Sequence, residues 1–212
     1  MFHLFAHAFL LSLGAMVPII NPLGHAPMFY MMTINDTIDE RRRVARRTSL
    51  YVFLILIVSL LTGQYILHFF GVTINDIRMG GGLIVAAAAW KMLGNVTRLT
   101  DSEESAAMEK ADITLTPMAT PILAGPGAMS LAIGLSSYGH SPIHYAGYIA
   151  GFAALALITV ICFYSSDYLA KYLGDNAIGA INRILGFLIL AIGVDLMITG
   201  LKNTLFASHL VH

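Results

Sequence analysis

The sequence predicts an all-α membrane protein with about six transmembrane helices, and three observations lead to that prediction. The 212 residues are 57% hydrophobic and only 11% charged, whereas soluble domains are typically about 25% charged. Several apolar runs reach the roughly 20 residues that a membrane-spanning helix needs. The charged residues gather between these runs, which leaves little room for a soluble domain. We therefore expect a single transmembrane domain over residues 1–212.

Apolar runs separated by polar interruptions define the expected helices. The N-terminus is apolar from the start and lacks a basic segment and a convincing cleavage site, so we expect it to be retained as the first helix. An arginine-rich loop follows this helix, and a mixed-charge loop runs from Asn95 to Asp112. The expected helices cover about residues 2–33, 48–71, 77–94, 113–137, 143–165 and 178–201.

Basic residues predict the orientation, because Lys and Arg near helix ends are retained on the cytoplasmic side. They cluster in the first, third and fifth loops, whereas only Arg78 and Lys202 lie on the opposite side. We therefore expect a multi-pass protein of the cell (inner) membrane with both termini extracytoplasmic. The densest cluster anchors this topology in the simplest interpretation, and it consists of Arg41, Arg42, Arg43, Arg46 and Arg47.

Composition and spacing argue against several classes of function. The net charge is zero, and no broad basic face offers itself to nucleic acid. The single cysteine, Cys162, lies in an apolar stretch and cannot support a disulfide framework. No histidines show metal-ligand spacing, so we expect neither a metal nor a cofactor. The motifs of intramembrane proteases are missing, and we expect no enzymatic activity.

Two proline- and glycine-containing motifs lie 103 residues apart and suggest an internal repeat. Pro18–Gly24 reads PIINPLG, and Pro121–Gly127 reads PILAGPG. Arg78 and Arg183 begin a second pair of similar segments. Chance similarity in apolar sequence rich in glycine and alanine is the alternative to a repeat.

The repeat predicts two copies of a three-helix unit, at about residues 1–100 and 108–212. Because three is odd, successive copies enter the membrane from opposite sides, and the two repeats are inverted. Each copy opens with a broken helix, which makes helices 1 and 4 the broken ones. Inverted repeats with discontinuous helices are typical of secondary transporters, which bind substrate near the bilayer midplane.

The proline breaks mark the expected substrate site. Proline removes a backbone donor and frees carbonyl groups that hydrocarbon cannot satisfy, so a break needs a polar cavity or a polar solute. Helix N-termini favour a carboxylate, and free carbonyls favour an ammonium group, so a zwitterion suits the site. Kinks that serve only packing are the alternative. The candidate substrate-binding residues are Asn21, Pro22, Gly24, Thr120, Gly125, Pro126 and Gly127.

Two titratable residues are candidates for proton coupling. Asp195 lies well inside the last expected helix, where a charge costs roughly 2.5–3.5 kcal/mol and often has a function. A structural hydrogen bond and exposure near the outer interface are the alternatives for Asp195. His25 follows the first break, and an imidazole can carry a proton at physiological pH. The alternative for His25 is a hydrogen-bonded bystander.

Several further motifs occur in a specific order and spacing along nearly the whole chain. They are Ile20–Gly24, Pro27–Phe29, Arg78–Ile84, Pro117–Gly127, Arg183–Gly186, Gly193–Leu196 and Thr199–Leu201. Together they resemble the MarC family of bacterial and archaeal integral membrane proteins, also called the small neutral amino acid transporter family, within the LysE-type transporter superfamily. The resemblance implies six transmembrane helices and, for members given a function, transport of glycine- and alanine-like amino acids driven by the proton gradient. His25 stands where an apolar or small residue would be the plainer choice, and this departure leaves open an altered substrate or an altered pH response.

These observations together predict a secondary transporter of small neutral solutes, with small neutral amino acids as substrates and protons as the coupling ion. A channel, or a membrane scaffold protein without active transport, is the alternative. The expected partners are a zwitterionic amino acid and the lipid bilayer, and a homo-oligomer is compatible with the sequence.

Overall fold

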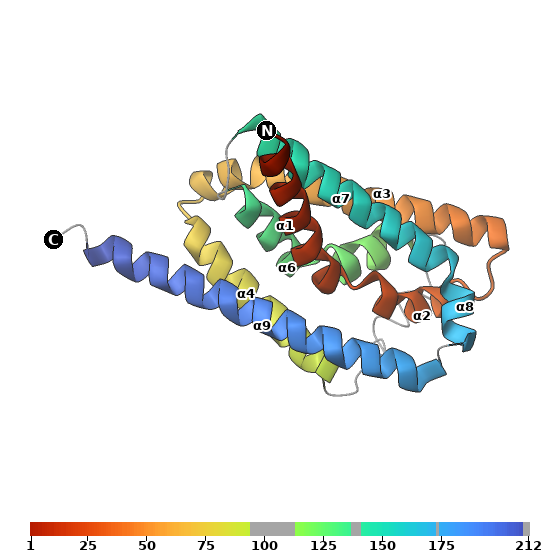
Figure 1. The fold of residues 1–212 in the computed structure, drawn as a ribbon. Coiled ribbons are helices and arrows are strands. Elements are labelled where there is room, and N and C mark those ends of the chain that lie inside the picture. Colours follow the sequence, from red (N-terminus) through yellow and green to blue (C-terminus); the bar gives the residue numbers. More distant parts are fainter. Residues whose placement is uncertain (94–112, 137–140, 173, 210–212) are drawn as a thin grey trace.

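The computed structural model describes residues 1–93, 113–136, 141–172 and 174–209, and this part of the chain contains helices and no strands (Figure 1). The expected loop from Asn95 to Asp112 lies outside the described residues. The elements are α1 (Phe2–Ile20), α2 (Pro22–Met32), α3 (Ile38–Phe69), α4 (Ile74–Leu93), the π-helical segment η1 (Thr114–Leu123), α6 (Pro126–Leu135), α7 (Pro142–Tyr164), α8 (Ser166–Tyr172) and α9 (Gly174–His209).

Four described segments are long and apolar enough to cross a membrane: Phe2–Ile20, Ile38–Phe69, Pro142–Tyr164 and Gly179–Leu205. The protein is therefore an all-helical membrane protein. The other two expected spans correspond to α4, which carries charged residues, and to the interrupted pair of η1 and α6. The number of six spans stays a prediction.

The arginine-rich segment is helical, so its assignment to a loop was wrong. Thr37 and Glu40 form a capping box, in which Thr37 N donates to Glu40 Oε2 at 2.9 Å and Glu40 N donates to Thr37 Oγ1 at 3.3 Å. Such a box satisfies the free N–H groups of a helix start. The box starts α3 at Ile38, about ten residues before the expected position. The prediction placed the start too late because a helix can extend beyond its apolar run into charged sequence. The expected link at 167–176 is likewise helical over most of its length, in α8 and the start of α9.

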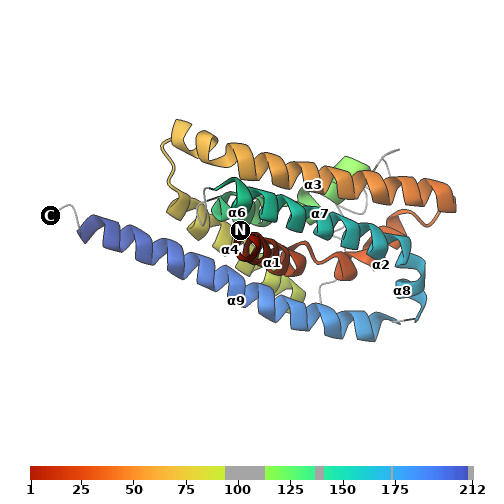
Figure 2. The same ribbon diagram turned by 45° about the horizontal axis from the view of Figure 1, so that its top comes forward.

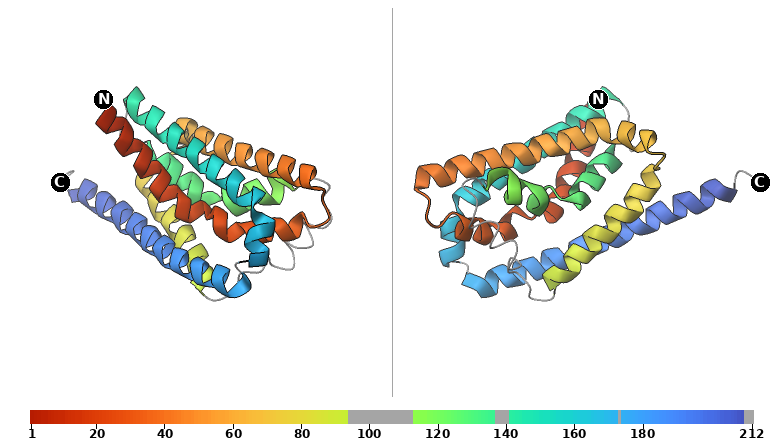
Figure 3. Two further views of the ribbon diagram at one scale, coloured as in Figure 1. Left: turned by 45° about the vertical axis from the view of Figure 1, so that its right-hand side comes forward. Right: turned by 180° about the vertical axis from the view of Figure 1, so that it is seen from behind.

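One bundle gathers α1, α3, α6, α7 and η1, as the three ribbon views show (Figures 1, 2 and 3). The helices α3 and α7 are antiparallel, since Arg42 near the start of α3 lies over the ring of Tyr164 at the end of α7. In contrast, α1 runs parallel to α7, with Ala8 against Gly147 and Ser12 against Gly151. The pair η1–α6 runs parallel to α3 in the same way.

The helices α4 and α9 form a second, antiparallel pair, in which α4 packs along the longer α9 (Figures 1 and 3). Glycines permit the contact: a Cβ on Gly82 would lie 2.6 Å from the carbonyl oxygen of Gly193, and a Cβ on Gly193 would lie 2.8 Å from that of Gly82. Lipid tails provide no hydrophobic force between helices, so close contact of small residues is what holds such pairs together. We call this contact the glycine seam, and Gly186 and Gly200 of α9 extend it.

Candidate functional site

The first expected break is present at a single residue, Asn21, which separates α1 from α2. Its backbone is left-handed, with φ 43° and ψ 60°, a conformation in which asparagine is enriched. The right-handed helical region is disfavoured before a proline, and Pro22 follows directly. Oδ1 of Asn21 accepts a hydrogen bond from Gly24 N at 3.0 Å and caps α2. The second half-helix therefore starts at Pro22, ahead of Gly24.

The side chain of Asn21 also ties the break to the last long helix. Its Nδ2 donates to Oδ1 of Asn182 in α9 at 3.1 Å, and both residues are only 3% exposed. Gly24 packs directly against the two amides, and any Cβ at that position would overlap them. Sequence reasoning missed Asn182, although an amide inside the expected helix 178–201 was the signal available for it.

His25 satisfies the carbonyl groups that the break leaves open. Its Nδ1 lies 3.0 Å from the backbone oxygens of both Ile20 and Asn21. Because carbonyl oxygens only accept hydrogen bonds, Nδ1 carries a hydrogen. This arrangement matches the alternative of a hydrogen-bonded residue, and Nε2 is the ring atom left for proton exchange.

The second expected break lies at Ala124 and Gly125, between η1 and α6. Gly125 is the N-cap of α6 in an extended conformation, and no side chain in the described part of the chain caps this helix start. Pro126 occupies the first helical position, so the half-helix begins ahead of Gly127. Thr120 is half-buried in η1.

A cavity of about 140 Å³ joins the second break to the end of α1. Its walls are apolar side chains and the backbone of the break. It has roughly the size of an engineered cavity that holds benzene, about 150 Å³. The residues around it are Ile19, Ile84, Val85, Ala88, Met92, Ile122, Leu123, Gly125, Pro126, Gly127, Ala128 and Ile189.

The cavity brings together part of the predicted site. Gly125, Pro126 and Gly127 line it, whereas Thr120 and the three residues of the first break do not. The first break is nevertheless close along the chain, since Asn21 follows the lining residue Ile19 by two positions.

Asp195 is not brought to the first break. It is exposed on α9, and it lies 13 residues beyond Asn182 in the same helix, about 20 Å along the helix axis. Within the described residues no cluster of three or more His, Cys, Asp or Glu side chains could hold a metal ion. The second break offers backbone N–H groups at the cavity, whereas the two amides and the imidazole lie at the first break, outside the lining of the cavity.

Comparisons with known proteins give a consistent result. The family model described as MarC family integral membrane protein matches residues 3–205. The chain is 33% identical to the membrane protein YvbG of Bacillus subtilis over 208 residues, 96% of each chain. It is 33% identical to the membrane protein YhcE of Escherichia coli over 87% of each chain. It is 32% identical to the inner membrane protein MarC of Salmonella typhimurium, over 94% of this chain and 96% of that protein. No solved structure matches the chain significantly.

Proposed function

The chain belongs to the MarC family of integral membrane proteins, and we propose that it is a proton-coupled secondary transporter of small neutral amino acids such as glycine and alanine. One observation carries the proposal: the uncapped start of α6 opens on a small apolar cavity that the end of α1 also lines. Exposed N–H groups at a helix start bind anions, and the helix dipole favours negative charge there. A carboxylate is the group that this position suits.

The size and lining of the cavity support a small, neutral substrate. A volume of about 140 Å³ leaves little space beyond the backbone atoms of an amino acid and a short side chain. None of the described residues that line it is charged, so a charged side chain would be desolvated without a partner among them, at high cost.

The buried amides of Asn21 and Asn182 are the proposed polar contacts of the substrate at the first break. Because neither amide lines the cavity, this contact requires a conformation in which the cavity extends to them. Each amide has both a donor and an acceptor, and their mutual hydrogen bond uses one donor of Asn21 and one lone pair of Asn182. The remaining groups can bind the ammonium or carboxylate of a zwitterion. Pro22 and Gly24 shape this end of the site, since Pro22 starts the half-helix and Gly24 leaves the space that the amides fill.

Asp195 or His25 carries the coupled proton in this proposal. His25 adjoins the first break and touches the backbone of Asn21. Asp195 is exposed on α9 and lies about 20 Å along the helix axis from Asn182, so its coupling to the first break requires a second conformation in which α9 has moved relative to the bundle.

Two contacts and two antiparallel helix pairs support the proposal of two inverted repeats, at about 1–100 and 108–212, within one transmembrane domain. Thr48 Oγ1 donates to the carbonyl of Thr114 at 3.2 Å. Adding the repeat separation of 103 to position 48 gives 151, and subtracting it from position 114 gives 11. The observed contact between Gly151 and Ser12 is one position away from this expected pair. The equivalent helices α3 and α7 are antiparallel, as are α4 and α9, and inverted repeats require this.

The proposed topology has six spans in the inner membrane, with both termini extracytoplasmic. Its support is the position of the basic residues. The arginines at the start of α3 then lie on the cytoplasmic side, and the end of α3 lies on the opposite side.

Flux through proteoliposomes tests the function. A transporter exchanges labelled glycine or L-alanine by saturable, stereospecific counterflow, and a pH gradient drives accumulation. Gradient-following flux without counterflow would make the protein a channel. Absence of flux for all twenty amino acids, together with no ligand-dependent rise in melting temperature, would leave a scaffold protein and overturn the proposal.

A further inference from the structure

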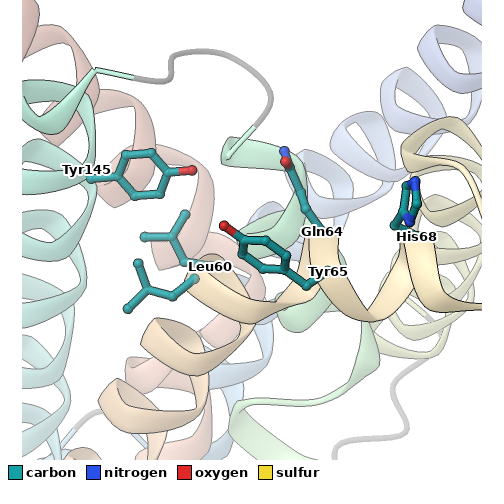
Figure 4. Close-up of a pocket in the computed structure, with 6 residues that line it drawn as sticks. Leu60, Gln64, Tyr65, His68 and Tyr145 are labelled. Carbon is teal, nitrogen blue, oxygen red and sulfur yellow. The ribbon is translucent and has the colours of Figure 1, made fainter.

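A second cavity, of about 720 Å³, lies at the other end of α6 from the break, between the end of α3 and the start of α7 (Figure 4). Binding cavities for small ligands typically measure roughly 300–1,000 Å³. A neighbouring cavity of about 490 Å³ shares Gln64 and His68 with it. The residues that line the larger cavity are Leu60, Leu61, Gln64, Tyr65, His68 and Tyr145.

The described lining combines two leucines with four polar side chains, and the cavity opens to its surroundings, since Tyr65 is 78% exposed. The hydroxyl groups of Tyr65 and Tyr145 point into the space between α3 and α7 (Figure 4), and Tyr145 packs edge-on against the ring of Tyr148 at 6.4 Å. No Lys, Arg, Asp or Glu is among the described residues that line the cavity. Such a lining suits a solute whose charges cancel, and it gives no partner to one with a net charge.

Gln64 links this cavity to the half-helix α6. Its Nε2 donates to Oγ of Ser136 at 2.8 Å, directly beyond the end of α6. Its Oε1 accepts no hydrogen bond from a described residue, although the side chain is half-buried. The amide is therefore held in place with one acceptor available to a ligand.

The length of α6 places the two cavities half a membrane apart. The helix has 10 residues, about 15 Å in length, and the hydrocarbon core of a bilayer is about 30 Å thick. If the break lies near the midplane, the cavity at Gln64 lies at the extracytoplasmic surface of the proposed topology.

We propose that the cavity between the ends of α3 and α7 is an outer binding site for zwitterionic amino acids, where substrate binds before it reaches the break. The order of binding, first at this cavity and then at the break, rests on the proposed function. The acceptor of Gln64 binds the ammonium group, the tyrosine hydroxyls donate to the carboxylate, and the leucines contact a short side chain.

Cysteine protection tests occupancy of the cavity without requiring flux. In a Cys162→Ser background, a cysteine introduced by Leu61→Cys lines the cavity, and one introduced by Ile66→Cys lies on the same helix, exposed but outside both cavities. A membrane-impermeant thiol reagent is added to intact cells with and without glycine. At glycine ten times above its Kd, labelling of Leu61→Cys should slow about tenfold, and labelling of Ile66→Cys should not change. Absence of labelling, or labelling that glycine does not slow, would overturn the outer site.

A variant of the deep site separates local protection from a distant conformational effect. With Asn21→Gly added, protection of Leu61→Cys should persist at the same glycine concentration. Protection that disappears would mean that glycine acts from the break, and the outer site would be wrong. Counterflow without protection rejects the outer site alone, whereas protection without any flux rejects the transporter proposal and retains the outer site.

Transport kinetics provide a second readout. Gln64→Leu should raise the KM for outside glycine about 3- to 10-fold, the effect of one lost hydrogen bond, with little change in maximal rate. Ser136→Ala removes the partner of Gln64 Nε2 and the hydroxyl's own bond to the Ile133 carbonyl, but it keeps Oε1 of Gln64 and should raise the KM less than Gln64→Leu does. An unchanged KM in Gln64→Leu, or an equal rise in both variants, would contradict a ligand contact at Gln64.

Discussion

The amide nitrogen of Asn21 donates a hydrogen bond to Oδ1 of Asn182 at 3.1 Å, across 161 residues of sequence. This bond joins the break between α1 and α2 to the last long helix, and it places two amides in a membrane protein where each is almost fully buried. A buried amide that loses its partner costs about 1–3 kcal/mol, so the pair is a sensitive point for both stability and binding.

Two substitutions of Asn21 separate its backbone role from its side-chain role. Asn21→Gly retains easy access to the left-handed conformation and removes the amide, so glycine binding should weaken by about 1–3 kcal/mol. Asn21→Ala should bind equally weakly and should also lose about 1–2 kcal/mol of stability, because alanine has neither the freedom of glycine in the left-handed region nor the local side-chain hydrogen bond that asparagine makes to Gly24 N. Titration of the melting temperature with glycine measures both effects. Wild-type affinity in Asn21→Gly would exclude Asn21 from the binding site.

A double-mutant cycle tests whether Asn182 binds the same ligand. If both amides contact one substrate, the loss of binding free energy in the double variant should differ from the sum of the losses in Asn21→Gly and Asn182→Ala by about 0.5 kcal/mol or more. Isothermal titration with glycine gives the four affinities. Additive losses would place Asn182 outside the substrate site.

The glycine seam predicts opposite outcomes for glycines on the same helix pair. Gly193→Ala places a methyl group 2.8 Å from backbone atoms of α4, and overpacking of this kind costs about 1–3 kcal/mol. At Gly80 no atom beyond its own helix turn lies within 4 Å of the added Cβ. The free energy of unfolding of Gly80→Ala should therefore stay unchanged or rise by up to about 1 kcal/mol from helix propensity. Thermal unfolding in detergent compares the two variants. Equal melting temperatures would show that the seam tolerates a methyl group.

Proton coupling is tested by charge removal at Asp195 and at His25. Asp195→Asn should abolish accumulation driven by a pH gradient and leave counterflow largely intact, because only net coupled flux requires the proton cycle. His25→Ala removes the donor to Ile20 and Asn21, so its folded yield must be checked alongside flux. If both variants, alone and combined, accumulate glycine at wild-type levels, another ion drives transport or the flux is facilitated diffusion.

Topology is tested by accessibility of introduced cysteines in a Cys162→Ser background. A membrane-impermeant reagent added to intact cells should label a cysteine at position 209 and should not label one at position 42, because the arginines around Arg42 favour the cytoplasm. The opposite pattern would reject both the proposed orientation and the inverted repeats.

Local chemistry made both helix breaks predictable from the sequence. Pro22 and Pro126 restrict the residues before them wherever they occur, and the observed interruptions lie within two residues of the expected ones. The start of α3 was missed because the capping box of Thr37 and Glu40 extends the helix into charged sequence, where an apolar window gives no signal.

Long-range contacts could not be predicted from a single sequence. Nothing local indicates that Asn182 reaches Asn21, since that contact depends on how α9 crosses the end of α1. The cavity at Gln64 likewise arises from the packing of α3, α6 and α7 together. The glycine seam, in contrast, has a signal in the sequence. Gly186, Gly193 and Gly200 are spaced seven residues apart, which places them on one face of α9.

The glycine seam also imposes an order on biosynthesis. Gly82 and Gly193 lie 111 positions apart, and a ribosome adds roughly 5–20 residues per second, so α4 emerges about 6–20 s before its partner. During that interval the bare glycine face of α4 is in the membrane without the helix that fits it. The glycine face of α4 can be covered only when α9 has been synthesised. A ribosome that stalls before Gly193 leaves a product whose exposed α4 face distinguishes it from the finished protein.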